Sequence, residues 1–132
     1  MIIDSSIIVS AYNGVDQNHE TGLKIIDDVE KGKYGKEIIV SNFIFDETMT
    51  AIFAKTKNKE FAIKVGNNLL GSCIMLNVDK IVFSKSFEMF SSKNKLSFTD
   101  CTIVVMANEY GIDHIATFDK EIKKYFRNCV DS

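Results

Sequence analysis

Four acidic side chains stand at the edges of apolar segments of the sequence, where an unbalanced carboxylate is poorly tolerated. They are Asp4 in MIIDSS, Glu47 in SNFIFDETMTAI, Asp100 in LSFTDCTIVVMA and Asp119 in HIATFDKEI. Each falls where a predicted strand ends or a predicted helix begins, so one fold could gather acids that are far apart along the chain. A pocket of this charge is stable mainly when divalent cations fill it. The four acids therefore favour a metal-dependent phosphodiesterase.

Ordinary structural roles are open to each of these acids as well. Asp4 and Asp119 directly precede predicted helices, where aspartate is a common N-cap. Ser97 and Asp100 have the spacing of a capping box, and the helix dipole also favours an ionised carboxylate in the first turn. Glu47 could form an ion pair with a lysine or lie at the edge of the core. A structural role does not exclude metal binding by the same carboxylate.

The helix expected around Glu47 carries the most informative pattern. One face of that helix combines positions i, i+4, i+8 and i+11, which are Phe43, Glu47, Ala51 and Ala54. The neighbouring Asp46 is turned about 100° away. We therefore expect Glu47 to share a stripe with residues that face the core. A carboxylate in such a place needs a partner.

Three hydroxyl side chains beside the acids are candidates for supporting roles. Ser6 follows the first acid by two residues and could hold its carboxylate or a water molecule on the metal. Thr117 precedes the last acid by two residues and could orient it, and Thr99 directly precedes Asp100. The alternative for each is an ordinary cap or strand position. The two histidines lack the spacing of metal ligands, and no phosphate-binding loop or HExxH motif occurs.

Short apolar runs alternate with segments of helical period, and no linker or repeat divides them. Strands are predicted at residues 1–4, 37–41, 73–78 and 114–118, with a marginal fifth strand at 128–130. Helices are predicted at 5–12, 19–31, 42–55, 59–70, 79–90, 99–110 and 119–126. Asn42 is the expected N-cap of the helix at 42–55. Gly71 is expected to end the helix at 59–70, and Gly111 is the expected C′ glycine of the helix at 99–110.

Two of these helices have predicted inward faces. The helix at 19–31 repeats apolar residues at Leu23, Ile26 and Val29. The helix at 79–90 is expected to bury Val82, Phe83, Phe87 and Phe90.

The alternation of strands and helices predicts an α/β fold with a parallel sheet covered on both faces. In such sheets ligands bind beyond the carboxyl ends of the strands. Asp4 and Asp119 lie at this edge, after the first and the fourth predicted strands. The predicted architecture and the predicted site are therefore consistent.

The composition limits the classes of function. A chain of 132 residues with 45% hydrophobic and 26% charged residues predicts a single soluble domain over residues 1–132. The formal net charge of −2 excludes a polycation that holds nucleic acid by bulk attraction. Three cysteines without a CxxC pair predict neither a disulfide framework nor a zinc site, and they fit a reducing cytoplasm. No signal peptide or membrane-spanning run is expected.

Any contact with nucleic acid must accordingly be local. Three groups of basic residues are candidates: Lys55, Lys57 and Lys59; Lys93 and Lys95; and Lys120, Lys123, Lys124 and Arg127. The alternative for each group is a solvated helix end.

The order and context of the four acids resemble the PIN-domain family of ribonucleases, above all its small VapC-like toxin branch. An apolar strand ending in aspartate, with serine two residues on, matches IIDSS at residues 2–6. The second family motif, a serine six residues before a helical glutamate, is matched by Ser41 and Glu47. The third motif is matched by FTD at 98–100, and the fourth by ATFD at 116–119. The family often has phenylalanine where this chain has Ile122. The similarity covers nearly the whole chain.

This resemblance implies a Rossmann-like three-layer α/β/α sandwich with a central, mostly parallel sheet of four to five strands. It implies an endoribonuclease that uses Mg²⁺ or Mn²⁺ and leaves 5′-phosphate and 3′-hydroxyl ends. The implied metal ligands are Asp4, Glu47, Asp100 and Asp119. The expected partners are RNA, an antitoxin protein and a second copy of the chain in a homodimer, without a membrane and in the cytoplasm.

Other functions remain open at this point. A PIN-domain nuclease of RNA processing would use the same chemistry, and a PIN-like binding module would have weak or lost catalysis, against which the presence of all four acids argues. A receiver-like signalling domain also binds Mg²⁺ through acids. Such a domain requires adjacent acids after the first strand, but in this chain Asp4 is followed by Ser5 and Ser6. It also requires an aspartate after the third strand, which here ends in Asn77 and Val78.

Overall fold

A five-stranded parallel sheet forms the centre of the computed structural model, which describes all residues from 1 to 132. Its strands are β1 (Ile2–Ile3), β2 (Ile39–Ser41), β3 (Ile74–Leu76), β4 (Ile115–Ala116) and β5 (Cys129–Val130). Their order across the sheet is β3-β2-β1-β4-β5. The N-terminal strand is therefore central, with Ile2 opposite both Ile39 of β2 and Ile115 of β4.

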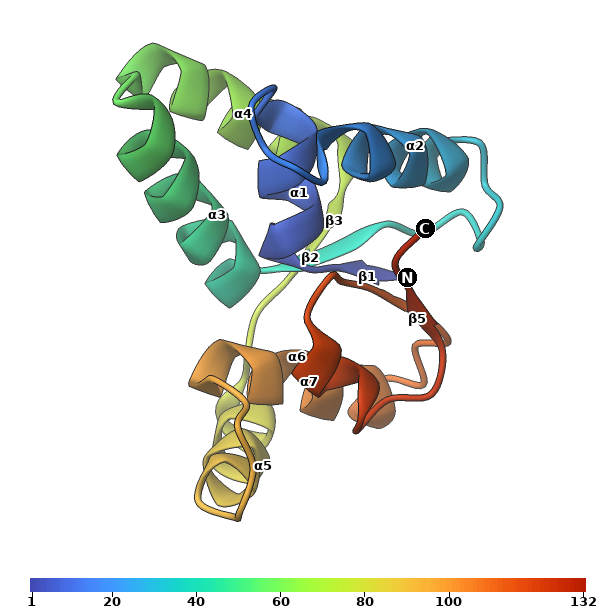
Figure 1. Cartoon of the computed structure of the whole chain (residues 1–132). Coiled ribbons are helices and arrows are strands. Elements are labelled where there is room, and N and C mark those ends of the chain that lie inside the picture. The colour runs from blue at the N-terminus through green and yellow to red at the C-terminus, as the bar shows by residue number, and fades with distance from the viewer.

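Seven helices connect and cover these strands. They are α1 (Ser5–Tyr12), α2 (His19–Glu30), α3 (Asn42–Thr56), α4 (Lys59–Ser72), α5 (Lys80–Phe90), α6 (Phe98–Glu109) and α7 (Lys120–Lys123). Helices α1 to α4 lie on one side of the sheet and α5 to α7 on the other (Figure 1). The predicted three-layer α/β/α sandwich with a parallel sheet is confirmed, and the marginal fifth strand is present.

The core explains why such short strands are stable. The side chains of β1 and β4 are buried, because helices cover both faces of the sheet. Helix α6 is buried over seven consecutive residues, from Cys101 to Ala107, which places it beneath the sheet rather than at the surface. The chain switches direction across the sheet between β1 and β4, and in such sheets ligands bind beyond the carboxyl ends of the strands at this point.

The predicted inward face of α5 is wrong for its aromatic residues. Phe83, Phe87 and Phe90 have exposed fractions of 49%, 60% and 44%, and only Val82 and Ser86 of this helix are buried. The main neighbour of α5 is α6, so one narrow stripe suffices for packing. Phe83 and Phe90 instead pack edge-on against Phe98 at the molecular surface.

The predicted face of α2 is also shifted. Leu23 is 47% exposed, whereas Gly22, Ile25 and Val29 are buried. Gly22 sets this orientation, since a Cβ atom there would lie 2.3 Å from the hydroxyl oxygen of Ser10. Helix α2 therefore packs on α1 through a residue that has no side chain.

Smaller differences concern the ends of the helices. Ser41, and not Asn42, caps α3 by accepting a hydrogen bond from the amide of Ile44 at 3.1 Å. Helix α4 continues one residue past Gly71, whereas α6 is followed by Gly111 at a φ of +62°, as expected of a C′ glycine. None of the helices has both the length and the apolar character required for a membrane span.

Candidate active site

Asp4 leaves the central strand β1 at its carboxyl end and points into the protein. Its backbone amide continues the ladder by donating to the carbonyl of Ala116 at 2.9 Å, and the residue is only 3% exposed. The carboxylate does not cap α1, contrary to the N-cap interpretation. Instead Oδ2 accepts hydrogen bonds from the hydroxyls of Ser6 at 2.8 Å and Thr117 at 2.7 Å. Two of the three candidate supporting hydroxyls, those of Ser6 and Thr117, thus fix one oxygen of this acid.

Glu47 reaches Asp4 through a residue that the sequence did not single out. The Ser5 hydroxyl donates a short hydrogen bond to Oε1 of Glu47 and lies 3.5 Å from Oδ1 of Asp4. Glu47 has no lysine within ion-pair distance, so the alternative role as a partner of a lysine is not found. Only the adjacency of Ser5 to Asp4 could have drawn attention to this serine.

Asp100 lies at the start of α6 in the predicted capping box. The hydroxyl of Ser97 accepts from the amide of Asp100 at 3.1 Å, and Oδ2 of Asp100 accepts from the amide of Ser97 at 3.0 Å. Burial, reinforced by the charges of Asp119 and Asp4, raises the pKa of Asp100 from 3.8 to about 6, against the opposing effect of the hydrogen bonds from Ser97.

Asp119 follows β4 and begins α7. Its Oδ1 accepts from the amide of Glu121 at 2.8 Å, as predicted for an N-cap. Its own amide donates to the hydroxyl of Thr117 at 3.0 Å. Thr117 therefore connects Asp119 to Asp4, because the same hydroxyl donates to the Asp4 carboxylate.

The site has a marked excess of negative charge. Burial raises the pKa of Asp4 above its ordinary value, and the charge of Glu47 adds to this, while the hydrogen bonds from Thr117 and Ser6 oppose it. None of the four acids forms an ion pair with Lys, Arg or His. Repulsion among unpaired carboxylates is what a bound cation removes.

The free oxygens of the acids fit a hard divalent cation. Each aspartate has one oxygen held by strong hydrogen bonds, and its other oxygen has at most the 3.5 Å contact from Ser5. Oxygen ligands are the ones that Mg²⁺ and Mn²⁺ prefer. The side chains are not drawn together into a finished cage, since no group of three or more His, Cys, Asp or Glu is gathered closely enough to hold an ion. Side-chain rotation is needed to bring the free oxygens onto a single ion.

The stripe that contains Glu47 faces an open groove and not the core, which corrects the expectation from the helical pattern. The core face of α3 is Ile44, Thr48 and Ile52. The stripe lines a hollow of about 450 Å³ formed by Phe43, Asp46, Glu47, Thr50, Ala51, Ala54 and Thr99. Thr99 therefore lies in the groove, but its hydroxyl donates to none of the acids.

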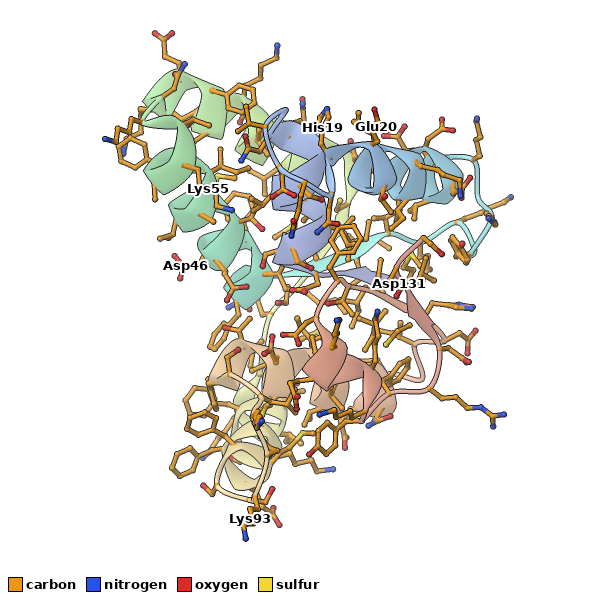
Figure 2. The ribbon with its side chains drawn as sticks, viewed as in Figure 1. His19, Glu20, Asp46, Lys55, Lys93 and Asp131 are labelled. Carbon is orange, nitrogen blue, oxygen red and sulfur yellow. The ribbon has the colours of Figure 1, made fainter.

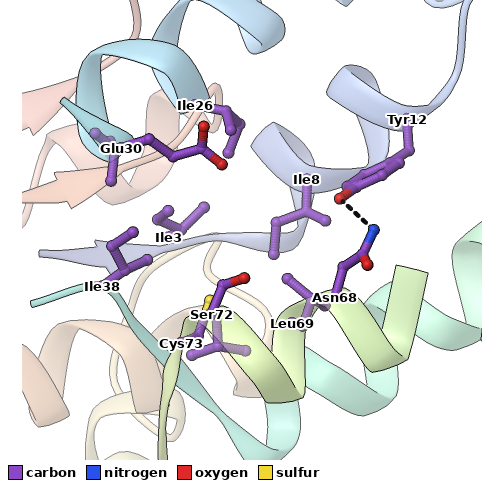
Figure 3. A pocket seen from close by; sticks show the side chains of 12 residues that line it. Ile3, Ile8, Tyr12, Ile26, Glu30, Ile38, Asn68, Leu69, Ser72 and Cys73 are labelled. Carbon is purple, nitrogen blue, oxygen red and sulfur yellow. Dashed lines mark hydrogen bonds between the residues drawn. The ribbon is translucent and has the colours of Figure 1, made fainter. Parts of the chain in front are cut away.

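A separate, partly enclosed cavity lies away from the acids. It has a volume of about 60 Å³ and lies among α1, α2, α4 and the sheet (Figure 3). Its wall is mostly apolar, with the amide of Asn68 donating to the Tyr12 hydroxyl at 3.4 Å at its edge. None of the four acids lines it, so it has no part in the candidate site.

Comparisons with known proteins agree with this arrangement. The family model described as the PIN domain matches residues 1–127. No curated protein sequence matches the chain significantly. Among solved structures, VapC20 of Mycobacterium tuberculosis, a toxin that cleaves the sarcin–ricin loop, superposes with a TM-score of 0.81 at 17% identity over 93% of this chain and 92% of that one.

Two further structures are similar over almost their whole length. VapBC2 from Rickettsia felis, solved with a DNA fragment from its promoter, has a TM-score of 0.67 at 16% identity and covers 98% of this chain and 94% of that one. FitAcB from Neisseria gonorrhoeae has a TM-score of 0.67 at 15% identity and covers 99% and 96%. At these identities the likeness establishes the fold.

Proposed function

Because the chain belongs to the PIN-domain family, we propose that it is a metal-dependent endoribonuclease and the toxin of a toxin–antitoxin pair. The proposed ligands of Mg²⁺ or Mn²⁺ are Asp4, Glu47, Asp100 and Asp119. The observation that carries the proposal is the buried carboxylate of Asp4, which shares the Ser5 hydroxyl with Glu47 and has no basic partner. A purely structural cluster of acids would be expected to contain a countercharge.

The chain's own residues hold the acids ready for the reaction. Ser6 and Thr117 fix Oδ2 of Asp4, which leaves Oδ1 directed toward Ser5 and Glu47. Ser97 holds one oxygen of Asp100 and leaves the other free. A divalent cation bound here would lower the pKa of a water molecule and stabilise the charge that develops on the phosphate. No side-chain nucleophile is required.

The proposal extends to partners and location. The structures of similar fold include VapC20, described as a toxin, and a toxin–antitoxin complex from Klebsiella pneumoniae. We therefore propose an antitoxin protein as partner, single-stranded RNA as substrate, a homodimer as the working form and the cytoplasm as location. The acidic groove requires metal before RNA can approach, since carboxylates repel phosphates.

The nuclease proposal is tested by incubating purified protein with total RNA and titrating Mg²⁺ or Mn²⁺. Cleavage should require the divalent ion, stop in EDTA and leave 5′-phosphate ends. Asp100→Asn should lower the rate at least about a hundredfold, because a ligand at the reacting phosphate is lost. Cleavage that persists in EDTA would contradict the proposal.

The toxin proposal is tested in growing bacteria by inducing expression. Induction should stop growth, and Glu47→Gln should restore it at an equal level of soluble protein, since the substitution removes one ligand charge but keeps the shape of the side chain. Glu60→Gln is the matched control on the neighbouring helix α4, because Glu60 is exposed and lines neither of the hollows that contain Glu47. Equal toxicity of the parent and Glu47→Gln would argue against nuclease action as the cause.

A further inference from the structure

The groove at the acids has two unequal halves. The hollow of about 450 Å³ on the side of Thr99 contains Asp46 and Glu47 but no basic residue. A second hollow of about 310 Å³ adjoins it, because both contain Glu47 and Ala51. The second hollow is lined by Ser5, Ser6, Val9, Ser10, Asp16, Asn18, Glu47, Ala51, Lys55 and Phe118. A basic side chain is thus present on one side of Glu47 only.

Lys55 is that basic side chain, and it has no partner in the protein. It lies two helical turns beyond Glu47 on the side of α3 that faces α1 (Figure 2). It forms no ion pair, although Asp16 and Glu47 line the same hollow. By contrast Lys123 and Lys124, from another basic group of the sequence, are paired with Asp131 and Glu121.

Asn18 adds a second free donor to the same hollow. It occupies the N-cap position of α2, where an asparagine side chain commonly accepts a hydrogen bond from the helix. Here its side chain makes no hydrogen bond. The bonds of this residue are those of its backbone, from its amide to the Asp16 carboxylate at 2.8 Å and from the amide of Gly22 to its carbonyl at 2.8 Å. The amide group is therefore free to donate to a ligand.

We propose that Lys55 and Asn18 bind the phosphate of single-stranded RNA next to the one that is cut, an inference that rests on the nuclease function above. An ammonium group and an amide N–H are suitable donors for a phosphate oxygen. The bound phosphate lies beside the scissile one, because Glu47, one of the four acids, lines this hollow together with its hydrogen-bond partner Ser5. The RNA strand accordingly enters or leaves the site along the cleft between α1 and α3.

The test compares cleavage of a randomised single-stranded RNA by the parent, Lys55→Ala, Lys55→Arg and Lys64→Ala. Lys64 is the matched control, because it is an exposed lysine of α4 that lines neither hollow. Lys55→Ala should raise KM about tenfold, as expected for loss of a charge-assisted hydrogen bond, with kcat nearly unchanged. The slope of log KM against log salt should fall by about 0.7, and Lys55→Arg should restore most of the affinity.

Asn18→Asp provides a second variant that keeps the fold. Aspartate is as good an N-cap as asparagine, so α2 should be retained, but the new charge would repel the phosphate. Its KM should rise at least as much as that of Lys55→Ala. If the parent cuts RNA and Lys55→Ala matches Lys64→Ala in KM and salt slope, the phosphate site is wrong and the nuclease function stands. If the parent cuts no RNA with any divalent ion, both proposals fail.

Discussion

At the scale of single residues, the fixing of Asp4 by two hydroxyl groups is the central feature of the site. Ser6 and Thr117 come from opposite ends of the chain, and both donate to Oδ2. A buried carboxylate with hydrogen bonds but no countercharge stays costly while it is ionised. The same arrangement leaves Oδ1 available on the side of Glu47. The native state without a bound cation is thus less stable, as expected of the proposed metal site.

This conflict predicts how stability depends on pH when divalent ions are removed. Because the pKa of Asp100 is raised from 3.8 to about 6 in the folded state, the folded protein retains a proton that the unfolded chain loses between these values. The free energy of unfolding in EDTA should therefore fall as the pH rises from about 4 to 6, and the raised pKa of Asp4 acts in the same direction. Urea unfolding at a series of pH values measures this.

The variant Asp100→Asn should remove the pH dependence that Asp100 contributes to the free energy of unfolding. It keeps an oxygen that can accept a hydrogen bond from the amide of Ser97. In EDTA at pH 7 it should be more stable than the parent by about 1 kcal/mol, a figure that allows for solvent screening of a half-exposed group. Asp113→Asn, at an exposed position before β4, is the control and should change little. An unchanged pH profile in Asp100→Asn would refute this account of the site's electrostatics.

At the scale of elements, the contact between α1 and α2 depends on Gly22. A Cβ atom there would lie 2.3 Å from Oγ of Ser10 and 3.0 Å from the backbone nitrogen of Ala11. The backbone atom cannot move without shifting α1, which carries Ser5 and Ser6 at its start. The packing of α2 is therefore coupled to the geometry around Asp4.

Gly22→Ala should accordingly destabilise the protein by roughly 1–3 kcal/mol, as overpacked sites commonly do, despite the better helix propensity of alanine. Gly71→Ala in α4 is the matched control, since a Cβ there meets nothing within 4 Å, and it should be neutral or stabilising. Thermal unfolding of the two variants checks the difference. Equal melting temperatures would show that α1 and α2 separate easily.

The sequence predicted the elements and several of their caps, because these depend on neighbouring residues. The capping box of Ser97 and Asp100, the N-cap at Asp119 and the C′ glycine at Gly111 were all found as predicted. The parallel sheet followed from short apolar runs between helices. These patterns are local, so no knowledge of the tertiary contacts was required.

The faces of the helices were harder to predict because they depend on the partner. Phe83 and Phe87 look like core residues by type, yet α5 has a single main neighbour, and they stay exposed. Leu23 is exposed because Gly22 allows the closest approach to α1. The role of Ser5 was missed, since its partner Glu47 is 42 positions away in the sequence.

At the scale of the whole molecule, the four acids are held by separate elements that meet at one edge of the sheet. Asp4 follows β1, Glu47 lies on α3, Asp100 on α6 and Asp119 before α7. A cation that binds these groups therefore ties the helices on both sides of the sheet to one point. Such a ligand stabilises the native state as a whole by mass action.

Addition of Mg²⁺ or Mn²⁺ should consequently raise the melting temperature. At a concentration of about a hundred times Kd the gain is about 2.7 kcal/mol, which corresponds to roughly 10 °C for a chain of this length. Asp4→Asn should lose most of this rise, whereas Asp113→Asn should keep it. Differential scanning calorimetry in EDTA and in each metal measures the effect, and a parent protein without any response would contradict the ligand assignment.

The central position of the first strand has a consequence for synthesis on the ribosome. Ile2 pairs with Ile115, and the Asp4 carboxylate accepts a hydrogen bond from the hydroxyl of Thr117, which lies 113 positions later in the chain. A nascent polypeptide that ends before Ile115 has neither strand β4 nor Asp119. We therefore expect translation intermediates and variants that end before Thr117 to lack the proposed nuclease activity.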